Sequence, residues 1–258
     1  MRRAAILAIV LALCAPAVQA ASGGHLEGYI PAVAHADGRF GSSWTSDVWI
    51  YQQGASLIHL WFNRAGSDNT DNESVVVTLD QPVTHLSDIV AGLFGTDGVG
   101  SVHYLADGPV TVVSRTWTST EGGVGTYGQT IPGMPISMAS TPGMGQGGAL
   151  RSLIDQREGF RANLGLVNVS ANALTVVVEI FTADGQPAPG NSSFTVDLQP
   201  FEMRQVNDVL NRLDAGERQG LIIRAGIDSG NGGILAYLSE VDNRTNDASY
   251  QDGFRFAF

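Results

Sequence analysis

One short segment contains residue types that could carry out catalysis. His85, Ser87 and Asp88 have the composition of a hydrolase triad, but they stand at the expected start of a helix, where such residues usually cap free N–H groups. The sequence has no nucleophile elbow, zinc-protease motif, phosphate loop or dinucleotide fingerprint. We therefore expect a protein that is not an enzyme. The alternative is a secreted hydrolase with a site between two modules, involving His59 or His103.

Two loops are dense in oxygen ligands. Asp68, Asp71 and Glu73 lie in one, and Asp242 and Asp247 lie in the other. Calcium prefers six to eight oxygen ligands, so both loops are candidate Ca²⁺ sites. Neither has the spacing of an EF-hand loop, and Asx-rich segments commonly form turns through local hydrogen bonds. The turn interpretation is therefore favoured, and no cofactor is expected apart from a possible Ca²⁺ ion.

Four aromatic or imidazole side chains are predicted on an outer sheet face. Alternation along residues 47–51 and 57–63 places Trp49, Tyr51, His59 and Trp61 away from the core. Exposed aromatic groups usually mark a contact. The contact could be an interface between two modules of this chain, a partner protein, or a carbohydrate.

The sequence contains an internal repeat of the elements that are expected to position these residues. Each copy has an apolar set spaced as one face of a helix, at 86–93 and 206–213, with Ser87 and Asn207 as predicted N-caps. Strand-like segments precede and follow both sets. The matched segments are 44–50 with 160–166, 57–63 with 174–181, 74–79 with 193–198, 101–105 with 221–225, and 110–117 with 235–241.

Alternation also predicts the core. The residues expected to point inward are Val48, Ile50, Ile58, Leu60, Phe62, Leu164, Leu166, Val176, Val178 and Ile180. Short β-branched and aromatic runs between Gly, Asn, Asp and Pro turns are typical of an antiparallel sandwich. We predict an all-β protein made of two tandem immunoglobulin-like β-sandwiches of about seven strands each, with one short helix per module.

The module boundaries follow from composition. Module one spans 25–132, a linker rich in Gly, Pro, Ser and Met spans 133–148, and module two spans 149–258. The final strand, at 254–258, alternates three phenylalanines onto one face. It could pair with the sheet edge of a neighbouring molecule, which makes self-association possible.

The N-terminus predicts export. Arg2 and Arg3 precede an apolar stretch, and small residues allow cleavage after Ala20 or Ala21, so residues 1–20 are expected to be a signal peptide. The stretch is too short to span a membrane. The only cysteine, Cys14, lies within it, and the residues before it argue against a lipid anchor. The mature chain would then contain no cysteine and no disulfide.

The charge argues against two classes of partner. Removing Arg2 and Arg3 leaves 12 basic residues against 25 acidic ones, a net charge of −13, and the sequence contains no lysine. Nucleic acids and anionic membrane surfaces are therefore poor partners.

Six further segments stand out as motifs. They are YIPAVAH at 29–35, WTSD at 44–47, SRTW at 114–117, GTYGQ at 125–129, FRANLGLVN at 160–168 and VDNRTND at 241–247. In these segments the chain resembles a group of uncharacterised exported bacterial proteins with paired β-modules. The resemblance implies a periplasmic, cell-surface or extracellular module without known chemistry. We therefore expect a non-catalytic binding or structural module that contacts a protein or a glycan, with carbohydrate binding as an alternative.

Overall fold

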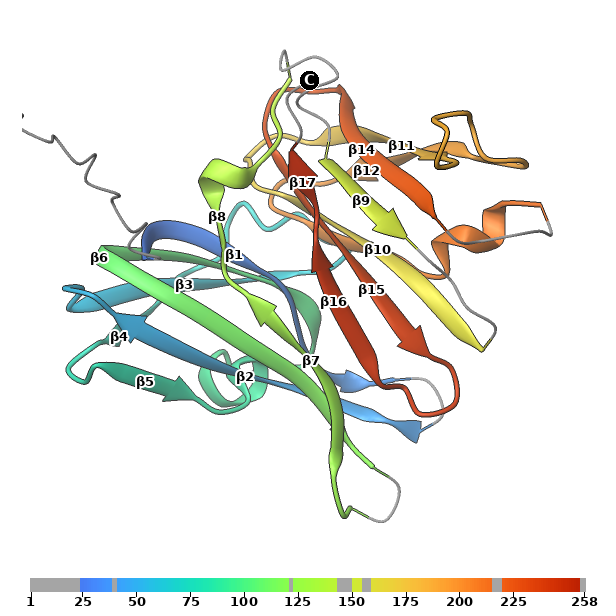
Figure 1. Ribbon diagram of the computed structural model, residues 1–258. Helices are drawn as coiled ribbons and strands as arrows, with labels where there is room; N and C mark the ends of the chain where they lie inside the picture. Colours follow the sequence, from blue (N-terminus) through green and yellow to red (C-terminus); the bar gives the residue numbers. More distant parts are fainter. Residues whose placement is uncertain are drawn as a thin grey trace, which may run out of the picture.

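The protein is almost entirely β-structure. A computed structural model (Figure 1) describes residues 24–38, 41–120, 123–142, 150–154, 159–214 and 220–255. The predicted signal peptide, Cys14 and residues 256–258 of the predicted last strand lie outside these ranges. Within them, no helix has the length and apolar character needed to cross a membrane.

The first repeat, which we define as β1–β8, forms one eight-stranded sheet. Its longest strand, β6, has 22 residues. The first half of β6 pairs with β1 and β3, and its second half pairs with β2 and β7, so the sheet folds around its own core. The strands are β1 (His25–Asp37), β2 (Ser43–Gln52), β3 (Leu57–Arg64), β4 (Val75–Thr78), β5 (Val83–Leu86), β6 (Gly98–Ser119), β7 (Thr126–Pro132) and β8 (Met134–Pro135).

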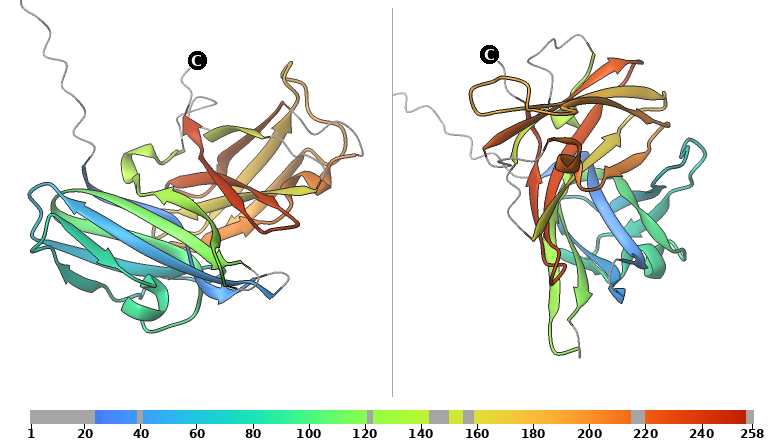
Figure 2. Two further views of the ribbon diagram at one scale, coloured as in Figure 1. Left: turned by 60° about the horizontal axis from the view of Figure 1, so that its bottom comes forward. Right: turned by 90° about the vertical axis from the view of Figure 1, so that its right-hand side faces the viewer.

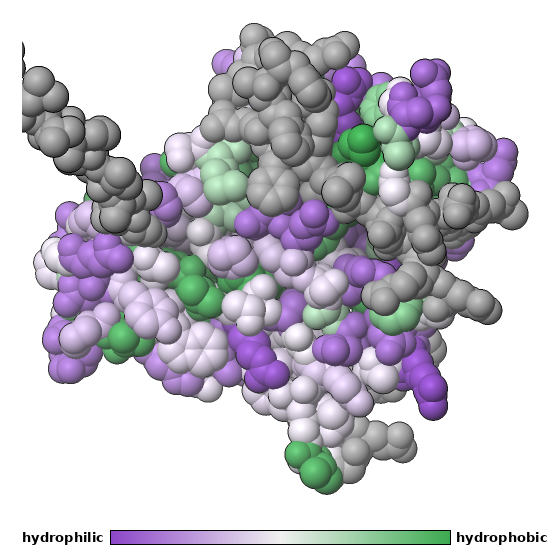
Figure 3. Space-filling model, in the orientation of Figure 1, coloured by the Kyte–Doolittle hydropathy of each residue, from purple (hydrophilic) through white to green (hydrophobic). Residues whose placement is uncertain are grey.

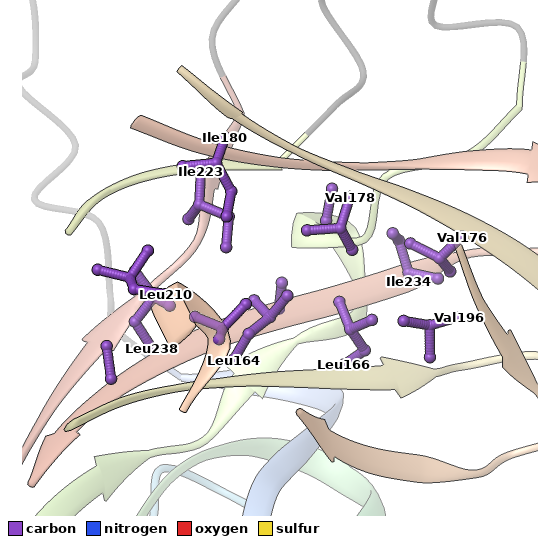
Figure 4. Close-up of a cluster of buried hydrophobic side chains, with 14 of the residues drawn as sticks. Leu164, Leu166, Val176, Val178, Ile180, Val196, Leu210, Ile223, Ile234 and Leu238 are labelled. Atoms are coloured by element: carbon purple, nitrogen blue, oxygen red, sulfur yellow. The ribbon is translucent and has the colours of Figure 1, made fainter. Parts of the chain in front are cut away.

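The second repeat, which we define as β9–β17, forms two sheets. The four-stranded sheet has the order β13-β10-β15-β16, and the five-stranded sheet has the order β12-β11-β14-β9-β17. The strands are β9 (Leu150–Ile154), β10 (Phe160–Asn168), β11 (Leu174–Phe181), β12 (Ser193–Leu198), β13 (Met203–Val206), β14 (Leu221–Ser229), β15 (Ile234–Asp242), β16 (Ala248–Asp252) and β17 (Phe254–Arg255). Apolar side chains from both sheets meet between them, as Figure 4 shows.

The pairing pattern is the same in the two repeats if β6 is counted as β14 and β15 joined. β2 pairs with β5 and the second half of β6, as β10 pairs with β13 and β15. β3 pairs with β4 and the first half of β6, as β11 pairs with β12 and β14. In the second repeat the strand is interrupted around Gly230, whose φ is +99°. In the first repeat β6 is continuous through Gly108, where a Cβ would lie 2.8 Å from the backbone nitrogen of Ala55.

A single helical turn stands at the predicted place in each repeat. The first is a π-helical turn at Ile89–Leu93 (η2), and the second is a 3₁₀ turn at Val209–Arg212 (η5). A third short 3₁₀ turn, η3, spans Ile136–Met138. The predicted N-caps Ser87 and Asn207 are wrong by one residue, because Asp88 and Asp208 occupy the cap positions in left-handed conformation.

The same hydrogen bond anchors both caps to a strand. Asp47 Oδ1 accepts from the backbone N–H of Asp88 at 2.9 Å, and Asn163 Oδ1 accepts from that of Asp208 at 3.0 Å. A side chain on β2 or β10 therefore supplies the acceptor for the cap's free N–H group. This shared bond fixes the correspondence between the repeats, with Asp47 equivalent to Asn163.

The predicted all-β class and the predicted core are confirmed. Each residue expected to point inward is buried, from Val48 and Ile50 in β2 to Ile180 in β11. The immunoglobulin-like arrangement is not confirmed. The strands of the first repeat belong to one eight-stranded sheet and not to two, and both repeats have more strands than the expected seven or so.

The repeats pack side by side (Figure 2), with β16 against β7. A separate apolar cluster lies between them, formed by Tyr29, Met134, Ala139, Val167, Met203 and Leu235. The first part of the predicted linker takes part in this contact. β8 pairs with β1, and Ser140 exchanges two backbone hydrogen bonds with Ile234, both at 2.9 Å.

Candidate functional site

Trp49 and Tyr51 lie on a surface that we call the β2 surface. Its residues project from the outer face of β2, β5 and the second half of β6, and they are Trp49, Tyr51, Val83, His85, Val113 and Trp117. Register places Trp49 opposite His85 and Tyr51 opposite Val83. Tyr51 is 42% exposed and Val83 is 43% exposed, so the surface ends in accessible apolar groups.

Internal contacts hold the β2 surface in place. The rings of Trp49 and His85 stack with centroids 4.7 Å apart and planes 9° apart. Trp117 Nε1 donates to Asp47 Oδ2 at 3.0 Å, while the other oxygen of Asp47 binds the helical cap. Arg115, beside Asp47 in the sheet, donates to Thr126 Oγ1 at 2.7 Å. The rings of Trp49 and Trp117 are thus held in place by contacts within the protein.

His59 and Trp61 lie on a different surface, the β3 surface. Its residues are His59, Trp61, Val76, His103 and Leu105, on the outer face of β3, β4 and the first half of β6. Trp61 stacks on His103 at 4.9 Å and on His59 at 5.8 Å. His103 stacks in turn on Tyr29 of β1 at 4.6 Å. A row of rings therefore runs from the buried contact between the repeats to the exposed edge of the sheet.

His103 lies between Tyr29 and Trp61 in this row. Its side chain is 18% exposed, and its Nε2 lies 3.0 Å from Glu27 Oε1. Burial lowers the pKa of His103 and outweighs the opposite effect of Glu27. Burial also raises the pKa of Tyr29, so its hydroxyl stays protonated.

The expectation of one aromatic face is corrected by this geometry. On β6 the β3 surface is centred at His103 and the β2 surface at Val113, ten residues apart. At about 3.3 Å per residue this is roughly 30 Å of strand. The alternation that placed all four side chains outward was right, but it could not show that β2 and β3 pair with opposite halves of β6.

Neither surface is the contact between the repeats. None of the four predicted residues belongs to the apolar cluster at that contact, which Tyr29 joins from β1. On the face that Figure 3 shows, apolar residues form small groups between polar ones, as on most soluble proteins. Sequence reasoning missed Val83, His85 and Trp117, because only strand register brings them beside Trp49 and Tyr51.

The triad-like residues do not meet. His85 stacks on Trp49, while the Oδ2 atom of Asp88 lies 2.7 Å from His35 Nδ1. Ser87 is exposed beside them. The arrangement gives no hydrogen-bonded nucleophile and base in this segment.

Two of the five candidate calcium ligands, Asp68 and Asp242, accept hydrogen bonds within their own turns. Asp68 Oδ1 accepts from the N–H and hydroxyl of Thr70, and these bonds lower the pKa of Asp68. Asp242 accepts from the N–H of Arg244 at 2.8 Å. Asp71 and Glu73 are exposed, and Asp247 accepts from Gly128 and Ala248. In the described ranges, no three His, Cys, Asp or Glu side chains are grouped as metal ligands.

Comparison with known proteins adds no assignment. No protein-family model matches the chain, and no curated protein matches it. The resemblance to exported paired β-modules therefore stays a prediction.

Proposed function

We propose that the protein is an exported, non-catalytic binding or structural module that acts at the cell surface or in the extracellular matrix. Contact would be made through the β2 surface and along its short edge strand β5. The observation that carries the proposal is the fixed Trp49–His85 pair next to exposed Tyr51 and Val83. Preordered aromatic groups with an accessible apolar neighbour are typical of contact residues.

The geometry favours a protein partner over a sugar. Trp49 and Trp61 each stack on an imidazole of the protein itself, so part of their ring area already has an internal partner. A sugar would need that ring area for stacking, whereas a protein interface also uses ring edges and neighbouring aliphatic groups. Val83 supplies such a group in register with Tyr51.

The test is retention of the exported chain on its own cells or matrix. Trp49→Ala and Tyr51→Ala should each lower the retained fraction without unfolding the protein, because both side chains project from the outer face. Val177→Ala is the matched control, since Val177 is a half-buried residue on an outer face of the second repeat. Equal retention of the wild type and both aromatic variants would overturn the proposal.

A further inference from the structure

The second repeat shows what covers the face that corresponds to the β2 surface. With Asp47 equivalent to Asn163, Trp49 corresponds to Gly165 and Tyr51 to Val167. The same pairings match His85 with Gln205 and Val113 with Tyr237. The two faces are therefore the same part of the fold, built from different side chains.

In the second repeat this face is buried against the first repeat. Val167 and Leu235 are 0% exposed, and Met203 is 3% exposed, within the cluster shared with Tyr29 and Met134. Tyr237 is 1% exposed and fills the space above Gly165. In this fold the face is thus one on which another β-repeat can pack.

In the first repeat the same face carries larger aromatic groups and no described part of the chain covers it. Tyr51 and Val83 are both more than 40% exposed there. The charged groups of the face have partners on the protein, because Asp47 bonds Trp117 and Arg115 bonds Thr126. Asp47 and Arg115 are register neighbours with opposite charges, so covering the face would bury no net charge from these two groups, and each already has a hydrogen-bond partner on the protein.

We infer that the β2 surface pairs with the β2 surface of a second copy of this chain. This inference rests on the proposed function and names the partner of the same surface. A two-fold arrangement lets one patch contact itself and closes after two copies, which is the commonest geometry of soluble oligomers. It brings two low-charge aromatic faces together and keeps the acidic remainder of each chain in water.

The experiment is sedimentation velocity on the exported chain over a series of concentrations. The wild type should shift from monomer to dimer. Tyr51→Arg and Val83→Arg should each raise the dimer dissociation constant about 30-fold or more, the change expected for a central interface residue. Val76→Arg is the matched control, since Val76 is 53% exposed on the β3 surface, and it should dimerise like the wild type.

Each outcome decides between the two proposals. A wild type that stays monomeric at every concentration overturns the pairing, as does a dimer that both arginine variants leave intact or that Val76→Arg also dissociates. A monomer whose Trp49→Ala variant loses retention leaves the proposed function standing. If that monomer binds a polysaccharide through Tyr51, the partner is a glycan. If the protein dimerises but the wild type and Trp49→Ala are retained equally on cells or matrix, the proposed function is wrong and the pairing stands.

Discussion

Asp47→Ala would remove a carboxylate that joins the first helical turn to the β2 surface. Its two oxygens accept from the N–H of Asp88 at 2.9 Å and from Trp117 Nε1 at 3.0 Å. A hydrogen bond to a charged acceptor contributes about 1.5–3 kcal/mol, and partial exposure of Asp47 places each bond at the lower end. We therefore expect the free energy of unfolding of the first repeat to fall by about 2–3 kcal/mol.

The second repeat supplies the control for this change. Asn163 accepts the equivalent bond with an amide oxygen, so Asp47→Asn should keep the bond to the cap and lose the one from the indole, at about 1 kcal/mol. All four tryptophans, at 44, 49, 61 and 117, lie in the first repeat. Tryptophan fluorescence during urea unfolding therefore reports that repeat, even where two cores unfold in separate transitions.

Two results would refute this reasoning about Asp47. One is an alanine variant within about 0.5 kcal/mol of the wild type, which is the range of ordinary surface substitutions. The other is an asparagine variant less stable than the alanine variant, since this would mean that the cap bond contributes nothing. Near-ultraviolet circular dichroism would also show whether the asymmetric environment of the indoles is lost together with the bond from Trp117.

Three further changes test the packing of the repeats. Gly165→Ala should destabilise by about 1–3 kcal/mol in thermal unfolding, because its Cβ would lie 1.8 Å from the Tyr237 ring; adding Tyr237→Val should recover part of the loss, and additive effects would contradict the clash. His103 has a lowered folded pKa, so the unfolded state takes up its proton first and stability should fall as pH drops below about 6.5. His103→Gln should flatten this slope in urea titrations at several pH values, and an unchanged slope would contradict the assignment to His103. Glu202→Ala removes a fully buried carboxylate that accepts from the N–H of Gln199 and from the half-exposed Arg204, and it should lower the free energy of unfolding by about 2 kcal/mol; a loss under about 0.5 kcal/mol by circular dichroism would contradict this.

Local pattern predicted the elements and their faces correctly. Alternation in 57–63 and 174–181 fixed which side chains are buried, because the side-chain period of a strand does not depend on its neighbours. The helical turns were placed correctly for a similar reason, since the recurrence of one apolar spacing at equivalent positions is a local signal. The cap was misplaced by one residue because a left-handed Asp88 is held by Asp47, which is 41 residues away.

Strand order could not be predicted from such patterns. Whether β2 and β3 share a sheet face depends on how each pairs with β6, and alternation contains no information about pairing partners. Gly108 illustrates the difficulty. A glycine and a proline in succession usually predict a turn, yet β6 continues through Gly108 and Pro109. The backbone of Ala55 approaches Gly108 closely at this point. The predicted aromatic face is divided into the β2 and β3 surfaces because β2 and β3 pair with opposite halves of β6.

The two repeats use equivalent outer faces differently, and this difference supports the functional proposal. In a chain of two repeats, one equivalent face can be used inside the molecule and the other is left over. Repeat proteins that need no partner usually make the left-over face polar. Here the used face has Gly165 beneath Tyr237, and the left-over face has Trp49 stacked on His85 beside exposed Tyr51. Aromatic groups on a face that no described part of the chain covers are the reason why we propose a partner outside the chain.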